Sequence, residues 1–170
     1  MRVHLYNGSL GLVRRSGVGQ AFYHQKAMLE QAGVAVTESW DSHADAVHIN
    51  TVLPDAVFAA LRARMRGETV VYYGHSTMQD FRDSFVGSNL LAPLFGRWIR
   101  FCYDLGDFII TPTPYSQQIL ESYHLKKPVC VLSNGVDTDF FAPDPALREH
   151  FRREHQLADD QPVVVSVGHY

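Results

Sequence analysis

Short runs of β-branched and aromatic residues alternate with longer segments of helical periodicity along most of the chain. This alternation predicts strands joined by helices, and such units place successive strands parallel to one another in a sheet that helices cover. We therefore expect an α/β fold built on a parallel sheet. Most of the runs are bounded by Gly, Pro, Asp or Asn, and the expected strands cover residues 3–6, 34–37, 46–50, 69–73, 108–111 and 129–132.

Helical periodicity places the expected helices at residues 20–31, 55–66, 89–104, 114–123 and 144–155. Gly33 and Gly67 stand where glycine commonly ends a helix. The third helix is unusually apolar, because Leu90, Ile99 and Phe101 widen its apolar stripe. The side chains that we expect to face the core are Phe22, Ala27 and Met28 in the first helix, Phe58, Leu61 and Met65 in the second, and Leu91, Leu94, Phe95, Trp98 and Cys102 in the third.

The character of the sequence changes after Asn134 and Gly135. A charged helix at 144–155 is followed by an apolar run at 162–167, which has the continuous pattern of a strand buried on both faces. We interpret residues 1–140 as an N-terminal domain and 141–161 as an interdomain linker and helix. Residues 162–170 are then the first strand of a second domain, which implies that the 170 residues are a truncated two-domain protein.

Composition and motifs exclude several classes of function. The net charge of −3 gives no general positive field for binding nucleic acid, and no apolar run is long enough for a transmembrane helix. Cys102 and Cys130 lie in apolar runs without a zinc or redox spacing, so we expect buried free thiols and a cytoplasmic protein without an export signal. The spacing of His43 and His48 gives no convergent metal geometry, and Asp137-x-Asp139, which formally matches a metal-bound nucleotide-sugar motif, has a structural explanation in the turn after Asn134 and Gly135.

Glycines follow the first expected strand, in the loop that leads into the first helix. Gly17 and Gly19 let the backbone approach an anion, and the free N–H groups at a helix start favour negative charge. The spacing does not match a dinucleotide fingerprint, since Phe22 stands where the third glycine belongs. The alternative is a loop whose glycines only cap the helix.

Polar side chains follow the fourth and fifth expected strands, at the sheet edge where α/β proteins bind ligands. His75, Ser76 and Thr77 follow the fourth strand and suit recognition of a hydroxylated ligand; the alternative is a structural histidine. After the fifth strand come Thr113, Tyr115 and Ser116, where Thr113 before a proline is also the pattern of a simple helix cap.

Arginines near two helices define a candidate membrane-contact rim. Arg62 and Arg66 share one face of the second helix, and Arg97 and Arg100 share a face of the third, beside Trp98. Such a pattern is typical of an interfacial helix attracted to anionic lipid. The alternative is a solvated helix face above a core stripe.

The order of these motifs resembles the retaining GT-B glycosyltransferases of family 4. The resemblance covers nearly the whole chain and includes Gly17-Val18-Gly19, the polar segments after the fourth and fifth strands, and the segment from Asn134-Gly135-Val136-Asp137 through Phe141 and Pro143 to residues 163–168. Within the family, residues 75–85 and 111–116 look most like those of bacterial diacylglycerol glucosyltransferases.

The resemblance implies a Rossmann-like N-terminal half that holds the acceptor, while the second domain holds most of the sugar nucleotide. It implies transfer of a hexose, taken as glucose from UDP-glucose, to a diacylglycerol-type lipid at the inner face of the cell membrane. By carry-over, Gly17 and Gly19 approach the donor diphosphate and His75 is the catalytic residue near the transferred sugar. The expected acceptor and sugar pocket comprises Ser76, Thr77, Thr113, Tyr115 and Ser116.

The same resemblance implies a nucleotide sugar and a lipid acceptor as partners, an anionic membrane surface as a further contact, and no metal or other cofactor. The isolated half is expected to be inactive. Two alternatives stay open on the sequence: a family 4 enzyme with a soluble acceptor, and a non-catalytic module that binds lipid or carbohydrate.

Overall fold

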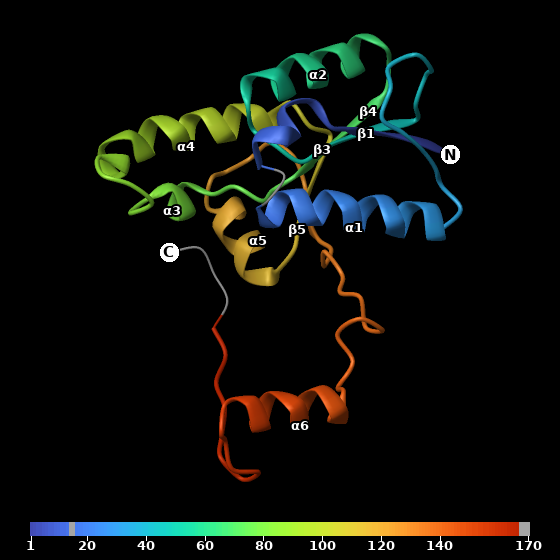
Figure 1. Cartoon of the computed structure of the whole chain (residues 1–170). Helices are drawn as coiled ribbons and strands as arrows, with labels where there is room; N and C mark the ends of the chain where they lie inside the picture. The colour runs from blue at the N-terminus through green and yellow to red at the C-terminus, as the bar shows by residue number, and fades with distance from the viewer. Residues whose placement is uncertain (14–15, 167–170) are drawn as a thin grey trace. The chain divides into compact units, whose positions relative to one another are not determined.

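The computed structural model describes residues 1–13 and 16–166 and confirms the expected parallel sheet (Figure 1). Its six strands run in the order β2-β1-β3-β4-β5-β6, and every neighbouring pair is parallel. The strands are β1 (Arg2–Tyr6), β2 (Ala35–Thr37), β3 (Ala46–Ile49), β4 (Thr69–Tyr73), β5 (Phe108–Thr111) and β6 (Val129–Val131).

All five expected helices form, with small shifts of their ends. They are α1 (Gly17–Gln31), α2 (Pro54–Met65), α4 (Ser88–Asp104), α5 (Pro114–Glu121) and α6 (Pro145–Glu154). The sequence reading missed two short elements, η1 (Gly8–Val13) and α3 (Met78–Phe81). Helix α1 begins three residues before the expected start, so Gly17 and Gly19 lie in its first turn.

Strand β4 shows how the two faces of the sheet are filled. Val70 and Tyr72 join the main core cluster together with residues of α2 and α4, while Tyr73 on the opposite face packs its ring against His48. Figure 1 shows α2 and α4 on one side of the sheet and α1 on the other. Because helices cover both faces, β4 is apolar along its length rather than alternating.

The prediction of which helix face packs on the core is wrong for α2 and for much of α4. Helix α2 packs through Ala56, Ala59, Ala60 and Ala63, and α4 through Ser88, Ala92, Gly96 and Ile99, with Cys102 and Tyr103 at its end. Small side chains let a helix axis approach the sheet closely, so the larger apolar side chains are left on the outer face. The expected core residues that are exposed instead are Ala27, Phe58, Leu61, Met65, Leu91 and Leu94. Cys130, expected to be buried, is also exposed, whereas Cys102 is a buried free thiol.

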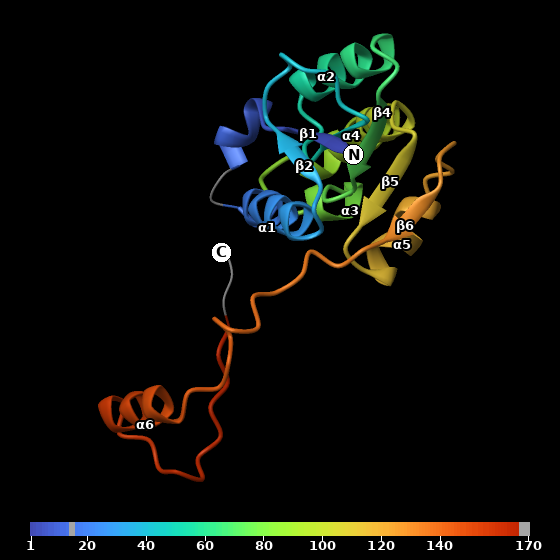
Figure 2. The same cartoon turned by 90° about the vertical axis from the view of Figure 1, so that its right-hand side faces the viewer.

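The chain divides into two compact units, residues 1–135 and 136–170. In the second unit, the Asp144 carboxylate caps α6 by accepting N–H groups of Ala146 and Leu147 at 2.8 and 3.0 Å. The buried Arg152 guanidinium donates to the carbonyl groups of Ala158 and Gln161. Figure 2 shows α6 and the segments that precede and follow it.

The strand expected at residues 162–167 does not form in its described part, residues 162–166. Residues 167–170 lie outside the part of the chain that the structure describes. Val164 is 94% exposed. A parallel strand needs a neighbour to accept and donate its backbone hydrogen bonds, and no described segment pairs with this one.

Within residues 1–13 and 16–166, no helix combines the length and apolar character that crossing a bilayer requires.

Candidate functional site

The carboxyl ends of the central strands bring the predicted ligand-binding segments to one edge of the sheet. The register pairs Ile49 with Tyr72 and Tyr73 with Ile110, so the residues that follow β3, β4 and β5 are neighbours. Parallel strands expose their free backbone ends at this edge, where α/β sheets bind ligands. Asn50, His75 and Thr111 all lie there.

His75 is placed by a tight exit from β4. The Gly74 N–H donates to the Ile110 carbonyl at 2.6 Å, and a Cβ added to Gly74 would lie 2.6 Å from the Leu120 side chain. Because Leu120 is fully buried, a larger residue at position 74 would collide with the core. The glycine therefore lets the chain pass close to α5 before it turns toward His75.

The His75 imidazole is largely enclosed and neutral. Its Nε2 lies 3.2 Å from the Asn50 Oδ1, and its ring stacks on Tyr73 with the centroids 5.9 Å apart. Burial lowers the pKa of His75 to about 4, because the imidazolium form would lose its hydration. His75 therefore offers hydrogen bonds rather than a positive charge at neutral pH.

Two buried polar side chains behind His75 were not identified as site residues from the sequence. The Asn50 amide donates to the Gln25 Oε1 at 2.8 Å, and the Gln25 Nε2 lies 3.3 Å from the Nδ1 of His48. Asn50 and Gln25 are almost completely buried. The sequence offers one sign of these residues, because each is a polar amide in or next to a segment that packs on the core. This sign does not show which hydrogen-bond partners the fold supplies.

Ser76 and Thr77 are both tied to the scaffold. The Ser76 N–H donates to the Tyr103 hydroxyl at 3.2 Å, and that hydroxyl donates in turn to the Ser76 carbonyl at 2.8 Å. The Thr77 hydroxyl caps α3: it accepts the Asp80 N–H at 3.1 Å and donates to the Asp80 carboxylate at 2.6 Å. The backbone after β4 is thus held from below by a buried tyrosine on α4.

The polar residues after β5 form a helix cap, as the alternative from the sequence predicted. Thr113 and Ser116 make a reciprocal capping box at the start of α5, with backbone-to-side-chain distances of 3.1 and 3.2 Å. Thr111 adds a hydrogen bond to the Ser116 hydroxyl at 2.8 Å. Tyr115 is 72% exposed in the first turn of the helix.

The first-turn amides of α1 stand at the same edge of the sheet. Gly17 is exposed and Gly19 is buried, and a hydrogen bond from the Gln20 N–H to the Ser16 carbonyl (3.2 Å) closes the first turn of the helix. Asp55 holds the start of the preceding loop by accepting the Ser9 N–H at 2.7 Å and the Tyr6 hydroxyl at 3.0 Å. A Cβ at Gly8 would overlap the Tyr6 ring.

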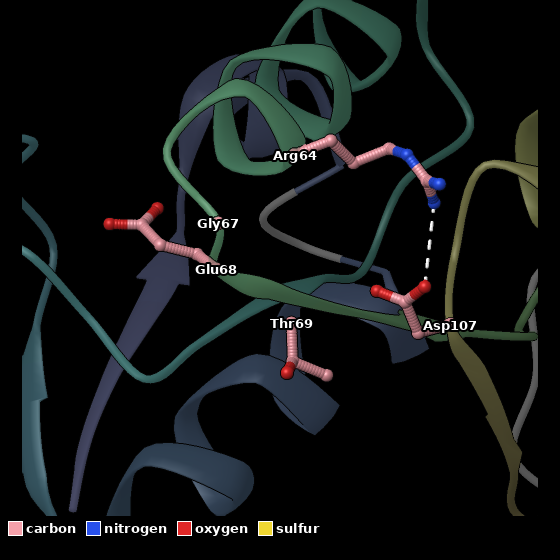
Figure 3. A pocket seen from close by; sticks show the side chains of 5 residues that line it. All are labelled: Arg64, Gly67, Glu68, Thr69 and Asp107. Atoms are coloured by element: carbon pink, nitrogen blue, oxygen red, sulfur yellow. Dashed lines mark hydrogen bonds and ion pairs between the residues drawn. The ribbon is translucent and has the colours of Figure 1, made fainter.

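A hollow of about 260 Å³ lies at the opposite edge of the sheet (Figure 3). Arg64, Gly67, Glu68, Thr69 and Asp107 line it, and the Arg64 guanidinium reaches the Asp107 carboxylate at 3.4 Å. Since Thr69 begins β4 and Asp107 precedes β5, this hollow is at the amino ends of the strands. It is therefore separate from the segments that carry His75 and Ser76.

The predicted membrane rim is only partly available at the surface. The Arg62 guanidinium lies 4.8 Å above the Trp40 ring, and Arg66 binds Glu68 at 2.9 Å and the Ser42 carbonyl at 3.0 Å. The half-buried Trp98 donates its indole N–H to the Val52 carbonyl at 2.7 Å.

Arg97 and Arg100 are exposed on α4 and form no ion pair with the described residues. The large apolar side chains exposed on the same helix are Leu90, Leu91, Leu94 and Phe101. We call these six residues the α4 outer surface.

Among the described residues, no three His, Cys, Asp or Glu side chains gather in a way that could hold a metal ion.

Comparison with known proteins connects this architecture with sugar transfer. The Glycosyltransferase Family 4 model matches residues 23–140. The chain is 38% identical over 169 residues to the processive diacylglycerol alpha-glucosyltransferase of Acholeplasma laidlawii. The matched region covers 99% of this chain and 50% of that protein. The chain thus spans about half the length of the curated relative it matches.

The fold is also similar to a solved structure. The crystal structure of Anabaena Alr3699/HepE in complex with UDP and glucose matches with a TM-score of 0.53 at 16% identity, over 92% of this chain and 50% of that one. A likeness at this identity concerns the fold alone. It confirms the expected Rossmann-like sheet of one half of a GT-B protein.

Proposed function

Because the chain belongs to glycosyltransferase family 4, we propose that it forms the acceptor-side half of a retaining enzyme that transfers glucose from UDP-glucose to a diacylglycerol-type lipid. The 38% identity to a diacylglycerol glucosyltransferase over nearly the whole chain supports this substrate class. The observation that carries the proposal is the neutral, enclosed His75 at the carboxyl edge of the sheet, fixed by Asn50 and by the glycine exit from β4.

In this proposal His75 contacts the transferred sugar as a hydrogen-bonding group. A neutral imidazole suits a site where the reacting groups are hydroxyls and the charge develops on the departing diphosphate. The first-turn amides of α1, at Gly17 and Gly19, supply N–H groups for that diphosphate, and positioning and electrostatic stabilisation account for the rate. Ser76, Thr77, Thr113, Tyr115 and Ser116 line the acceptor and sugar side, where the tethered backbone of Ser76 gives a rigid wall.

The experiment is a transfer assay with the full-length protein that contains this chain, using UDP-glucose and diacylglycerol in vesicles. We expect His75→Ala to lower kcat/KM at least about a hundredfold, the loss typical of removing a positioned hydrogen-bonding group at a reacting centre. His150→Ala is the matched control, since the His150 side chain is 73% exposed on α6 and belongs to none of the proposed site segments. Full activity of a folded His75→Ala protein would remove His75 from the proposed mechanism.

The same assay separates the alternatives. Transfer to a water-soluble acceptor but not to diacylglycerol would support the soluble-acceptor alternative, and binding of lipid or sugar without any transfer would support the non-catalytic module. Activity is expected to persist in the presence of a metal chelator, because the proposed catalysis uses no metal. Loss of activity on chelation and its return with a divalent cation would contradict this.

We propose that the α4 outer surface contacts the inner face of the membrane and so gives the enzyme access to its lipid. Its apolar side chains can enter the interface while Arg97 and Arg100 pair with anionic headgroups. Helix α2 lies on the same side of the sheet and adds Phe58, which is 72% exposed. Arg62 and Arg66 have partners within the protein, so in this proposal they contribute less than Arg97 and Arg100.

Vesicle flotation tests this contact. Binding is expected to need anionic lipid, to weaken as salt rises, and to fall when Arg97 and Arg100 are both changed to Glu. The charge-matched control changes Arg148 and Arg153 of α6 to Glu. Equal binding by both double variants would contradict the membrane contact.

A further inference from the structure

The buried amides behind His75 form a continuous hydrogen-bonded chain between two histidines. It runs from His75 Nε2 to Asn50 Oδ1 (3.2 Å), from Asn50 Nδ2 to Gln25 Oε1 (2.8 Å), and from Gln25 Nε2 to His48 Nδ1 (3.3 Å). The residues come from α1, the end of β3 and the segment after β4. Every link joins elements that are distant in the sequence, so only the folded chain assembles it.

We propose that Asn50 and Gln25 are positioning residues that hold His75 in the tautomer with its proton on Nε2, leaving Nδ1 as the hydrogen-bond acceptor for the ligand. The statement about the ligand rests on the proposed function; the statement about the tautomer does not. A side-chain amide has one donating and one accepting end, so each link of the chain fixes the direction of the next.

The direction follows from the central link. Asn50 uses its NH2 group toward Gln25, so its oxygen faces His75 and requires a proton on the His75 Nε2. Gln25 uses its oxygen toward Asn50, so its NH2 group faces His48 and requires an unprotonated Nδ1 there. Both imidazoles therefore carry their proton on Nε2. Reversal would require both amides to turn over and both histidines to change tautomer together.

The surroundings favour neutral rings throughout the chain. Burial lowers the pKa of both His48 and His75 to about 4, and in each case no charged neighbour contributes to the shift. A hydrogen bond of Gln25 also lowers the pKa of Tyr73, against the larger effect of burial, which raises it. A neutral chain of this kind polarises its members and resists reorganisation.

The remaining nitrogen of His75 is the one free to meet a ligand. Its Nδ1 forms no hydrogen bond with any described residue. This nitrogen is also not one of the fully buried, unpartnered polar atoms among the described residues, so it is accessible from outside the core. An unprotonated Nδ1 accepts a hydrogen bond from a hydroxyl group and repels a carbonyl or phosphate oxygen. The chain of amides thus selects a hydroxyl-bearing ligand group at this point.

Nitrogen NMR of histidine-labelled full chain at neutral pH is the direct test. We expect both His75 and His48 to show a protonated Nε2 and an unprotonated Nδ1. A proton on Nδ1 of His75 would overturn the proposal. This measurement needs no substrate, so its result tests the tautomer independently of the proposed glycosyltransferase activity.

Asn50→Asp tests whether the chain acts as a unit. A carboxylate only accepts hydrogen bonds, so Gln25 must turn its NH2 group toward position 50 and its oxygen toward His48. We expect the His48 proton to move from Nε2 to Nδ1 while His75 keeps its Nε2 proton. An unchanged His48 tautomer in the folded variant would show that the two histidines are not coupled through the amides, against the proposal.

Asn50→Leu supplies a kinetic test that does not bury a charge. In the full-length protein we expect kcat/KM to fall about tenfold to a hundredfold, because a misoriented group near the reaction is costly. Ser88→Ala is the control for loss of a buried polar group, since the Ser88 hydroxyl has no partner among the described residues. If Asn50→Leu keeps the wild-type His75 tautomer and activity, Asn50 does not position His75.

Discussion

The two ends of strand β4 carry polar clusters of opposite kinds. At the amino end, Glu68 receives hydrogen bonds from the Ala44 N–H at 3.0 Å and from Arg66 at 2.9 Å, and Asp107 meets Arg64 and Lys127. At the carboxyl end, the groups linked to His75 through hydrogen bonds are amides and an imidazole, which are neutral at neutral pH, and the Asp80 carboxylate in the next segment is bonded to the Thr77 hydroxyl.

With the proposed function, this difference gives the amino end a structural role and the carboxyl end a ligand-binding role. Charges that neutralise one another within the protein have little left to offer a ligand, even where they line a hollow (Figure 3). Neutral groups fixed by buried partners keep free hydrogen-bonding atoms directed away from the scaffold. The comparison predicts that changes at the carboxyl end alter activity, whereas those at the amino end alter stability alone.

Among the residues that support the two ends, the largest effect is expected from Tyr103→Phe, beneath the carboxyl end. The change removes the hydroxyl that both accepts from and donates to the Ser76 backbone, so it leaves two backbone groups without partners. We expect a loss of about 1–3 kcal/mol in the free energy of unfolding and a fall in kcat of about tenfold or more. Chemical denaturation and the transfer assay measure the two. A wild-type kcat in this variant would contradict the expectation that changes at the carboxyl end alter activity.

At the amino end, Glu68→Gln is expected to affect stability and its pH dependence. Burial acts to raise the pKa of Glu68, but hydrogen bonds from the Ala44 N–H and Arg66 outweigh it and the pKa is lowered from 4.5. The wild-type carboxylate therefore stabilises the fold above about pH 4.5, and this stabilisation is lost as the pH falls through the lower folded-state pKa. Denaturation across that range should show a loss of about 2 kcal/mol at neutral pH and a flatter acid limb in the variant. A change in kcat would contradict the assignment.

Thr113→Ala tests whether a residue that caps α5 also belongs to the proposed acceptor pocket. Losing the cap of α5 should cost about 1 kcal/mol in the free energy of unfolding. If the hydroxyl serves only as a cap, KM for the acceptor stays at the wild-type value in the transfer assay. A raised KM with unchanged stability would instead place Thr113 in the acceptor pocket.

The smallest effect is expected from Arg64→Met at the amino-end hollow. Arg64 and Asp107 are partly exposed, and solvent screens such a pair, so the variant should lose at most about 1 kcal/mol of unfolding free energy. Kinetic constants should match the wild type. A strong loss of transfer would show that the hollow, and not the carboxyl end alone, belongs to the active site.

Much of the fold could be predicted because the signals are local. All six strands and five helices follow from apolar periodicity, and the start of α5 follows from a threonine before a proline. His75 could be proposed because a parallel sheet has a known functional edge. Asn50 and Gln25 could not, because their partners depend on the register of β3 against β4 and on the packing of α1.

The amino-acid sequence by itself determined the parallel α/β architecture and the cap at the start of α5, since these rest on residue types at short spacings, and the order of its motifs carried the resemblance to its family. The tertiary structure decided which faces of α2 and α4 are buried, because their small residues pack closer to the sheet than the larger apolar ones. It also decided that His75 is neutral and hydrogen-bonded, because desolvation and hydrogen-bond partners arise only when distant segments are brought together.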